Sequence, residues 1–193
     1  DAGKAYSFDG EDSISAHVPE GLDNNPFTIS LWHKAADYLG YMENNWLIAF
    51  GSAATNKGYH VGLFGASDVL NIGFWNRGFS TDHQAPLDEW EHIAIIWDGG
   101  DMQSVYADGD KKGVFGLNGA IPLLDTNGEL RLGKQLFYEE YYKGQIDDVR
   151  IYNRALSEAE VAALYELESV SGSTFPEGYL FIETFDDLEL GPN

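Results

Sequence analysis

The chain has 193 residues, of which 32 are acidic and 11 basic, giving a net charge of −21, and it contains no cysteine. This charge argues strongly against nucleic acid as a partner, because phosphate contacts need clustered Lys and Arg, and it disfavours an anionic membrane surface. The lack of cysteine excludes disulfides and thiolate metal sites, and no apolar run approaches the roughly 18 residues of a membrane span. The length suits one domain, and we interpret the chain, which opens at Asp1, as an excised module.

Short β-favouring segments separated by Gly, Asn and Asp recur from one end of the chain to the other. This spacing is typical of an antiparallel sandwich and not of alternating strands and helices. In chain order, the predicted strands are Tyr6–Phe8, Ser13–Val18, Phe27–Lys34, Trp46–Phe50, Tyr59–Phe64, Leu70–Trp75, Glu91–Trp97, Gln103–Ala107, Gly113–Leu117, Glu129–Leu132 and Gly144–Tyr152. They would supply the two facing sheets of an all-β sandwich, joined by Asp-Gly, Asn-Gly and Gly-Gly turns.

The last predicted strand runs directly into a predicted helix. Side chains alternate between apolar and polar along much of Gln145–Tyr152, which indicates a strand. Ser157 then suits the N-cap of a helix, and Glu160 three residues later completes a capping box. Leu156 and Val161 can pack together as a hydrophobic staple. We therefore expect one short C-terminal helix that begins at Ser157 and lies against a sheet.

The segment Lys143–Tyr165 resembles the closing signature of the laminin-G-like, concanavalin-A-like jelly roll. Other landmarks of that family follow in the same order: AYSFDGEDSISA is similar to its opening strand, FTISLWHKA to its core strand, EWEHIAIIWDGGDMQSVYADGDKKG to its central hairpin and ELRLGKQ to its penultimate strand. The resemblance implies a two-sheet antiparallel β-sandwich over residues 1–168. Residues 169–193 begin with a Ser/Gly/Pro-bearing stretch and are predicted to form a linker, followed by either the start of a further β-domain or a tail that packs back on this one.

The same resemblance implies a structural calcium ion, because the first and last strands of this jelly roll are neighbours. In related glucanases the calcium is often held by the Asp of a motif resembling D-Y-V-R-V-Y, and that Asp aligns with Asp147. Calcium takes six to eight oxygen ligands, including backbone carbonyls. The expected ligands are Asp9, Gly10, Asp12 and Asp147. Two alternatives stay open: Asp148 could be the ligand instead, or these carboxylates could accept backbone N–H bonds or pair with Arg150.

Catalytic patterns are absent from the sequence. Glucanases with this fold carry two catalytic glutamates on one strand in an E-x-D-x-E pattern, and no predicted strand here has it. The five histidines show no metal-ligand spacing, and the Gly-x-Ser-x-Gly, phosphate-loop and dinucleotide-binding motifs are missing. The segment Asp108–Gly113 resembles part of an EF-hand loop, but Lys112 and Gly119 stand where ligands are required. We therefore expect that the chain is not an enzyme.

Aromatic residues beside acids and amides in predicted loops indicate binding instead. Ring faces can stack on the C–H surfaces of sugars, and carboxylates can accept hydrogen bonds from hydroxyl groups. The candidate ligand-binding residues are Tyr138, Glu139, Tyr141 and Tyr142 before the last strand, and Tyr41 and Trp46 near the long loop that follows the core strand. Trp75 and Asn76 lie at another strand end. Core packing is the alternative for any aromatic residue, and we expect it for Trp32, Trp90 and Trp97.

Together these observations predict a noncatalytic recognition module of a larger exported, bacterial, multidomain protein, secreted or at the cell surface. The expected partners are a polysaccharide or other glycan and neighbouring domains of the same chain. The alternative is a protein–protein interaction or spacer module with no glycan ligand. Exposed aromatic rings on a concave face or loop rim would favour the glycan, whereas a flat charged surface with every ring buried would favour the alternative.

Overall fold

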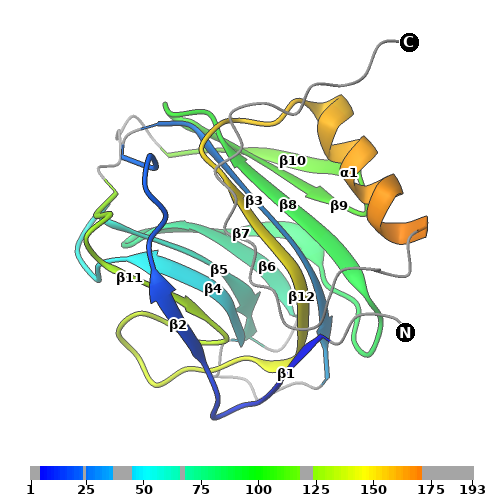
Figure 1. The fold of residues 1–193 in the computed structure, drawn as a ribbon, viewed down its shortest axis with the longest axis horizontal. Coiled ribbons are helices and arrows are strands. Elements are labelled where there is room, and N and C mark those ends of the chain that lie inside the picture. The colour runs from blue at the N-terminus through cyan, green and yellow to red at the C-terminus, as the bar shows by residue number, and fades with distance from the viewer. Residues whose placement is uncertain (1–4, 24, 37–44, 66–67, 118–123, 171–193) are drawn as a thin grey trace.

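Two six-stranded antiparallel sheets face each other in a computed structural model of the chain (Figure 1), which describes residues 5–23, 25–36, 45–65, 68–117 and 124–170. Sheet A has the strand order β1-β12-β3-β8-β9-β10, and sheet B has the order β2-β11-β4-β5-β6-β7. The strands are β1 Tyr6–Asp9, β2 Ile14–His17, β3 Phe27–Ala35, β4 Asn45–Gly51, β5 Gly58–Phe64, β6 Val69–Phe74, β7 Arg77–Gln84, β8 Glu91–Trp97, β9 Met102–Ala107, β10 Asp110–Gly116, β11 Glu129–Leu132 and β12 Lys143–Tyr152. This arrangement confirms the predicted β-sandwich and the pairing of the first strand with the last.

The main core lies between the two sheets. Alternating residues of each strand enter it, because successive side chains of a strand point to opposite faces. At its centre the ring of Phe27 packs 5.3 Å from Trp97 and 5.0 Å from Tyr59, measured between ring centroids. The hydroxyl of Tyr59 donates a hydrogen bond to Oε1 of Gln103 at 2.5 Å, so this buried polar group is satisfied. Each large apolar side chain removed from water here stabilises the fold by about 1.5–3 kcal/mol.

A smaller core lies on the outer face of sheet A, under the helix α1 (Glu158–Val170). The predicted capping box is confirmed: the backbone N–H of Glu160 donates to Oγ of Ser157 at 3.3 Å, and that of Ser157 donates to Oε2 of Glu160 at 2.7 Å. Leu156 and Val161 are both buried in this smaller core, as the predicted staple requires. Figure 1 shows the helix lying along the outer side of this sheet.

Three details differ from the sequence-based expectations. The strand β7 was not predicted, because its sequence RGFSTDHQ is largely polar. The helix continues to Val170, two residues into the predicted linker, while residues 171–193 lie outside the described part of the chain. Trp97 is fully buried as expected, but the expected burial of Trp90 is wrong, because its side chain is 40% exposed.

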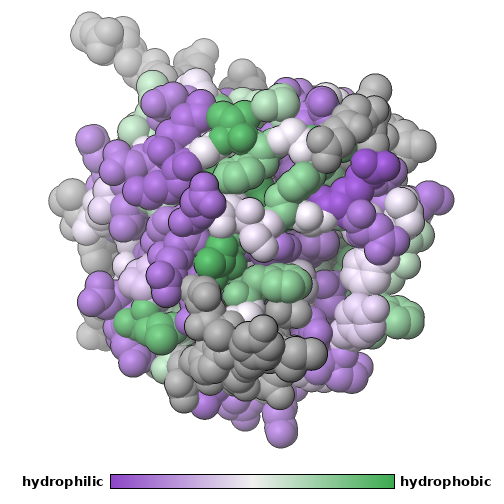
Figure 2. All heavy atoms as spheres, turned by 180° about the vertical axis from the view of Figure 1, so that it is seen from behind, coloured by the Kyte–Doolittle hydropathy of each residue, from purple (hydrophilic) through white to green (hydrophobic). Residues whose placement is uncertain are grey.

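The face of the molecule shown in Figure 2 is predominantly hydrophilic, and apolar residues lie on it in small groups between hydrophilic ones. Scattered apolar residues of this kind are normal on a protein surface and do not by themselves mark an interface. No helix in the described ranges is long and apolar enough to cross a membrane.

Candidate functional site

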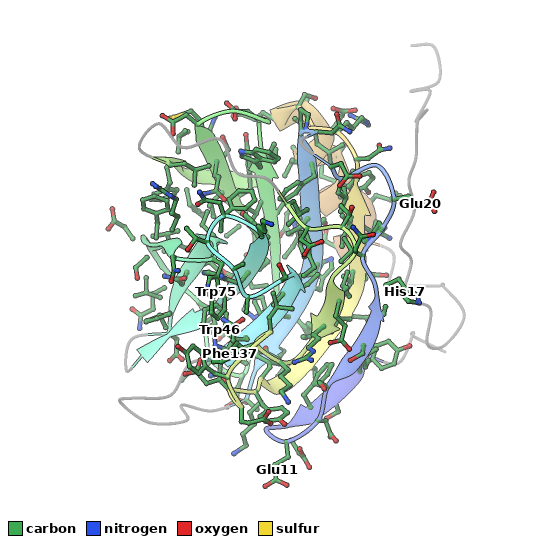
Figure 3. All side chains as sticks on the ribbon, turned by 90° about the vertical axis from the view of Figure 1, so that its left-hand side faces the viewer. Glu11, His17, Glu20, Trp46, Trp75 and Phe137 are labelled. Carbon is green, nitrogen blue, oxygen red and sulfur yellow. The ribbon has the colours of Figure 1, made fainter. Side chains whose placement is uncertain are left out.

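Residues of sheet B and of the loop between β11 and β12 line a cleft of about 320 Å³. Tyr59 and Phe74 pair with each other and point into the main core, so alternation sends the intervening positions of β5 and β6 outward, away from the core. Figure 3 shows Trp46, Trp75 and Phe137 close together on this outer side. The lining residues are Trp46, His60, Phe64, Asn71, Trp75, Asn76, Gly78, Gln135, Tyr138 and Glu140.

Glycines on three adjacent strands, β5, β6 and β7, lie beneath the side chains of the cleft, and one of them, Gly78, lines it. Gly62 lies opposite Trp46, and a Cβ atom on Gly62 would lie 2.6 Å from Cε3 of that indole. Gly73 pairs with Gly78, and a Cβ on Gly78 would lie 2.9 Å from Nε2 of His60. Glycine inside a strand marks a place where another group approaches the backbone closely. The missing side chains let Trp46 and His60 lie against the sheet and leave space above it.

The indole of Trp46 forms one wall of the cleft and is held in place by several contacts. Its Nε1–H donates to Oε2 of Glu140 at 2.6 Å, and its ring meets His60 edge-on at 4.9 Å and Phe64 edge-on at 5.9 Å. The side chain is only 4% exposed. The hydrogen bond therefore holds the Glu140 carboxylate at the cleft wall, and the flanking rings hold the indole.

Uncharged polar groups occupy the interior of the cleft. His60 is 7% exposed, and burial lowers its pKa to about 4, although a hydrogen bond with Asn71 opposes the shift, so the imidazole is neutral at neutral pH. Its Nδ1 atom has no hydrogen-bond partner among the described residues. Gln135 is also buried, and its Oε1 accepts the backbone N–H of Leu136 at 2.6 Å. These side chains give the cleft a neutral polar lining.

The outer rim of the cleft is aromatic. Trp75 and Tyr138 stack with ring centroids 6.1 Å apart and an interplanar angle of 22°. Phe137 packs edge-on against both rings, at 6.3 Å from Trp75 and 5.2 Å from Tyr138. Phe137 and Tyr138 are nevertheless 68% and 53% exposed. Exposed rings that are held rigid by one another form a platform on which a flat apolar surface can stack.

A tight loop carries this rim. The backbone N–H of Tyr142 donates to the carbonyl of Gly133 at 2.8 Å, and that of Gln135 donates to the carbonyl of Glu140 at 3.0 Å. These bonds make residues 133–142 a closed loop with Phe137 and Tyr138 near its tip. Ligand-binding residues commonly lie on loops that a rigid scaffold positions in this way.

The structure places the six predicted ligand-binding residues in different locations. Tyr138 and Trp46 line the cleft, and Tyr41 lies outside the described residues. The hydroxyl of Tyr141 donates to Oε2 of Glu139 at 2.5 Å, and neither residue lines the cleft. Hydrogen bonds from Lys134, at 2.8 Å, and from Tyr141 lower the pKa of Glu139. These two predicted residues therefore form a separate surface group on the same loop.

The prediction that Tyr142 faces a ligand is wrong. Its side chain is fully buried, its ring meets Phe8 edge-on at 6.2 Å, and its hydroxyl lies 3.4 Å from Nδ1 of His33. Of the neighbours Tyr141 and Tyr142, only one can face the core, because side chains alternate along an extended chain. The sequence does not say which, and the structure places Tyr142 inside.

The predicted calcium ligands do not come together as one set. Asp9 pairs with Lys143, whereas Asp147 lies four residues further along β12, a separation of about 13 Å along the strand. Oδ1 of Asp9 accepts the N–H of Glu11 at 2.8 Å, and Oδ1 of Asp147 accepts the N–H of Asp148 at 2.9 Å. Within the described ranges no three His, Cys, Asp or Glu residues are placed to hold a metal ion. Calcium binding stays a prediction, which thermal unfolding with and without a chelator would test.

Sequence reasoning missed His60, Asn71 and Gln135. The signal that could have found them is the row of strand glycines, Gly62, Gly73 and Gly78, in segments that otherwise favour β structure. The predicted group of Trp75 and Asn76 does line the cleft, but its position next to Tyr138 depends on the fold of the β11–β12 loop.

Comparisons with known proteins agree with this architecture. The family model described as the concanavalin A-like lectin/glucanases superfamily matches residues 8–162. A solved structure of domain 4 of AbnA, a GH43 extracellular arabinanase from Geobacillus stearothermophilus in complex with arabinotriose, is 25% identical, with a TM-score of 0.62 over 83% of this chain and 76% of that chain. The curated proteins that were searched include no match.

Two further solved structures share the fold at lower identity. The CBM40 of Ruminococcus gnavus IT-sialidase, bound to α2,3-sialyllactose, is 13% identical, with a TM-score of 0.64 over 84% of this chain and 96% of that chain. A putative carbohydrate binding protein from Bacteroides ovatus is 16% identical, with a TM-score of 0.60 over 82% of this chain and 45% of that chain. At these identities the likeness shows the fold alone.

Proposed function

Because this chain belongs to the concanavalin A-like lectin/glucanases superfamily, we propose that it is a noncatalytic carbohydrate-binding module whose site is the cleft on sheet B. The observation that carries the proposal is the stack of the half-buried Trp75 on the exposed Tyr138, beside a cleft that holds buried polar groups. The arabinotriose complex of the arabinanase domain, 25% identical to this chain, adds support.

The chemistry of the cleft suits a sugar. A pyranose or furanose ring has an apolar C–H face and a rim of hydroxyl groups, so it needs one aromatic surface and several hydrogen-bonding partners. The Trp75–Tyr138 stack supplies the surface, while Glu140 supplies an acceptor and Asn76 and Gln135 supply amide groups of the lining. A cleft with apolar walls and a few fixed polar groups is the usual form of a small-ligand site.

The lining does not suit glycoside hydrolysis. That reaction uses two carboxyl groups on opposite sides of the scissile bond, about 5 to 9.5 Å apart. Glu140 is the one carboxylate among the residues that line the cleft. A single carboxylate whose oxygen accepts the Trp46 indole N–H can orient a hydroxyl group, but the described lining contributes no second carboxyl group to act as acid or nucleophile.

We further propose that the module is extracellular and works beside other domains of a larger exported protein. The arabinanase domain, which shares the fold, comes from an enzyme described as extracellular. A recognition module of this kind would hold a neighbouring catalytic domain close to its polysaccharide, raising the effective concentration of substrate.

Removal of the aromatic stack tests the proposal. Polysaccharide binding would be measured by affinity gel electrophoresis and calorimetry for the parent chain and for a Trp75→Ala, Tyr138→Ala double variant. We expect the double variant to lose at least about 30-fold in affinity, roughly 2 kcal/mol, because central aromatic anchors dominate binding. Its unfolding midpoint should change little, since Tyr138 is more than half exposed.

Trp90→Ala is the matched control, because this indole is also exposed but does not line the cleft. Its affinity should equal that of the parent. Equal losses in both variants would mean that the aromatic stack is not the site. A parent chain that binds no polysaccharide in a broad panel would favour a protein-binding or spacer module instead.

A further inference from the structure

We infer that Arg131 is a positioning residue for glycan binding: it holds the β11–β12 loop so that the aromatic rim of the cleft is in place before a ligand arrives. Arg131 itself does not line the cleft. This inference rests on the proposed function and adds a residue that controls the affinity of the site from outside it. It follows from the place of Arg131 on sheet B and from the hydrogen bonds of its guanidinium group.

Arg131 lies on the same face of sheet B as the cleft. Its neighbours on β11, Leu130 and Leu132, belong to the main core, so alternation directs Arg131 outward. Arg131 is paired with Ala49 of β4, and Ala49 is paired with His60 of β5, which lines the cleft. Arg131 and His60 therefore lie in one row across the sheet, two strands and about 10 Å apart.

The β11–β12 loop spans the distance between Arg131 and His60. The backbone carbonyl of Gln135 accepts a hydrogen bond from Nη1 of Arg131 at 3.2 Å, and Gln135 also lines the cleft. The side chain of the next residue, Leu136, lies against Gly58 of β5, because a Cβ atom on that glycine would come within 2.9 Å of Cδ1 of Leu136. Arg131 thus supports the loop from the side opposite the cleft.

The guanidinium group of Arg131 makes four hydrogen bonds. Nη1 donates to the carbonyls of Gln135 and Leu136, at 3.2 Å and 3.1 Å. Nε and Nη2 both donate to Oε2 of Glu129, at 2.9 Å and 2.6 Å. The Glu129 carboxylate therefore fixes the plane of the guanidinium group, and this plane directs Nη1 toward the loop.

The carbonyls that Arg131 holds come directly before the aromatic rim. Phe137 and Tyr138 follow Leu136 in the chain, and their rings pack on each other and against Trp75. Both side chains are mostly exposed, so burial contributes little to holding them. Hydrogen bonds to the backbone that leads into them are therefore important for the order of the rim.

A lysine cannot replace this arrangement. The Lys ammonium group is a compact point charge without the planar fork of Arg, so it cannot bond to Glu129 and to two carbonyls in fixed directions. A ligand that must order a loop loses part of its binding free energy. An ion pair that is partly exposed adds little to the stability of a whole domain. We therefore expect Arg131 to act on affinity more than on global stability.

Arg131→Lys tests the inference, with Arg154→Lys as the matched control. Binding to arabinan, galactan, xylan and β-glucan would be measured by affinity gel electrophoresis and calorimetry at pH 7. We expect Arg131→Lys to bind the best of these polysaccharides about tenfold more weakly than the parent does, with an unfolding midpoint close to that of the parent. Arg154 also pairs with a glutamate, Glu160 at 2.8 Å, but does so beside helix α1, and its substitution should leave affinity unchanged.

Hydrogen exchange of the Gln135 amide distinguishes a positioning role from a merely structural one. In the parent this N–H donates to the carbonyl of Glu140 at 3.0 Å, so it should be protected without ligand, and a saturating oligosaccharide of the same sugar should change its exchange little. In Arg131→Lys it should exchange at least about tenfold faster without ligand and regain its protection when the oligosaccharide is bound.

Glu129→Ala is a second variant at an exposed position. Arg131 then keeps its bonds to the loop but loses the carboxylate that orients it, so affinity and protection of the Gln135 amide should both fall, by a smaller factor than in Arg131→Lys. Should Arg131→Lys fail to fold, this variant decides alone: unchanged affinity together with unchanged exchange would contradict the inference.

Three further results would contradict the inference in distinguishable ways. Unchanged affinity in Arg131→Lys, with binding still lost in the Trp75→Ala, Tyr138→Ala double variant, would overturn the role of Arg131 and leave the proposed function standing. Equal losses in Arg131→Lys and Arg154→Lys would show a general effect of substituting surface arginines. Binding of none of the four polysaccharides by the parent would overturn the proposed function together with the inference.

Discussion

The outer faces of the two sheets carry the same local arrangement and use it differently. On sheet A, Nε1 of Trp32 donates to Glu168 at 2.7 Å, and on sheet B, Nε1 of Trp46 donates to Glu140 at 2.6 Å. The first pair is covered, because Tyr165 of helix α1 stacks on Trp32 at 5.8 Å. The second pair lines the cleft. A tryptophan that donates a hydrogen bond to a glutamate can therefore belong to a core, where a helix covers it, or line a cleft, where no helix does.

The outward residues of each sheet determine which of these outcomes occurs. Sheet A presents Ile96, Tyr106 and Tyr152, which form a second core with the helix. Sheet B presents glycine, histidine and asparagine at the corresponding outward positions of β5 and β6, and these offer little apolar area for a helix to bury. Among the described residues, the β11–β12 loop packs over this face. The comparison teaches that the proposed recognition site lies on the sheet face that the helix does not cover.

Removal of Trp32 should have the largest effect on stability. Trp32→Ala should lower the free energy of unfolding by about 3 kcal/mol, because the helix loses its stacking partner and the Glu168 carboxylate loses a donor. Glycan affinity should stay the same, since the proposed site lies on the other sheet. Chemical denaturation and calorimetry on the same sample measure both quantities. A large loss of affinity with little change in stability would reverse the roles assigned to the two faces.

Low pH should lower the free energy of unfolding through one buried histidine on each sheet. Burial lowers the pKa of His60 on sheet B and of His92 on sheet A to about 4, and the charge of Arg150 contributes to the shift of His92. An unfolded chain has ordinary histidines with pKa near 6.5, so it binds protons first as the pH falls, and stability falls between pH 6.5 and pH 4. At pH 5 the expected loss is about 2 kcal/mol for each histidine.

Substitution of each histidine separates these contributions. His60→Gln and His92→Gln should each remove part of the pH dependence of the free energy of unfolding, measured by denaturation at pH 7, 6 and 5. Saturating glycan should move the NMR titration of the His60 ring and leave that of His92 unchanged. A ligand-dependent shift at His92 would contradict the separation of the two faces.

Removal of the helix cap should have the smallest effect. Ser157→Ala deletes the acceptor for the Glu160 N–H and should lower the free energy of unfolding by about 1 kcal/mol. Glycan affinity should not change, because α1 lies on sheet A. Hydrogen exchange would show faster exchange confined to the first turn of the helix. Faster exchange in the β11–β12 loop would indicate that the two faces are coupled.

The sequence predicted most strands and the helix start because those signals are local. The capping box of Ser157 and the alternation of β12 depend on neighbouring residues only. The strand β7 was not predicted because an edge strand with solvent on one side needs few apolar residues, and its sequence has few. Local patterns thus determine the elements, with the edge as the exception.

The site was less predictable because it depends on the register between strands and on which of two adjacent residues faces the core. Asp9 and Asp147 were expected together from the pairing of two strands, but the register separates them by four residues. Tyr142 was placed outside because alternation alone does not say which of two adjacent tyrosines faces the core. His60 meets Gly78 only because three strands lie side by side, which no local pattern reveals.

The packing of cleft side chains against strand glycines has a consequence for the kinetics of recognition. The Trp46 indole lies against Gly62 and the His60 ring against Gly78, and both side chains are buried, so they are already ordered before a ligand arrives. A ligand that binds beside them orders very little of the protein, so the entropic penalty of association is small. We expect encounter and release to be fast even where affinity is modest, which would let a tethered module move along a polysaccharide by repeated short contacts.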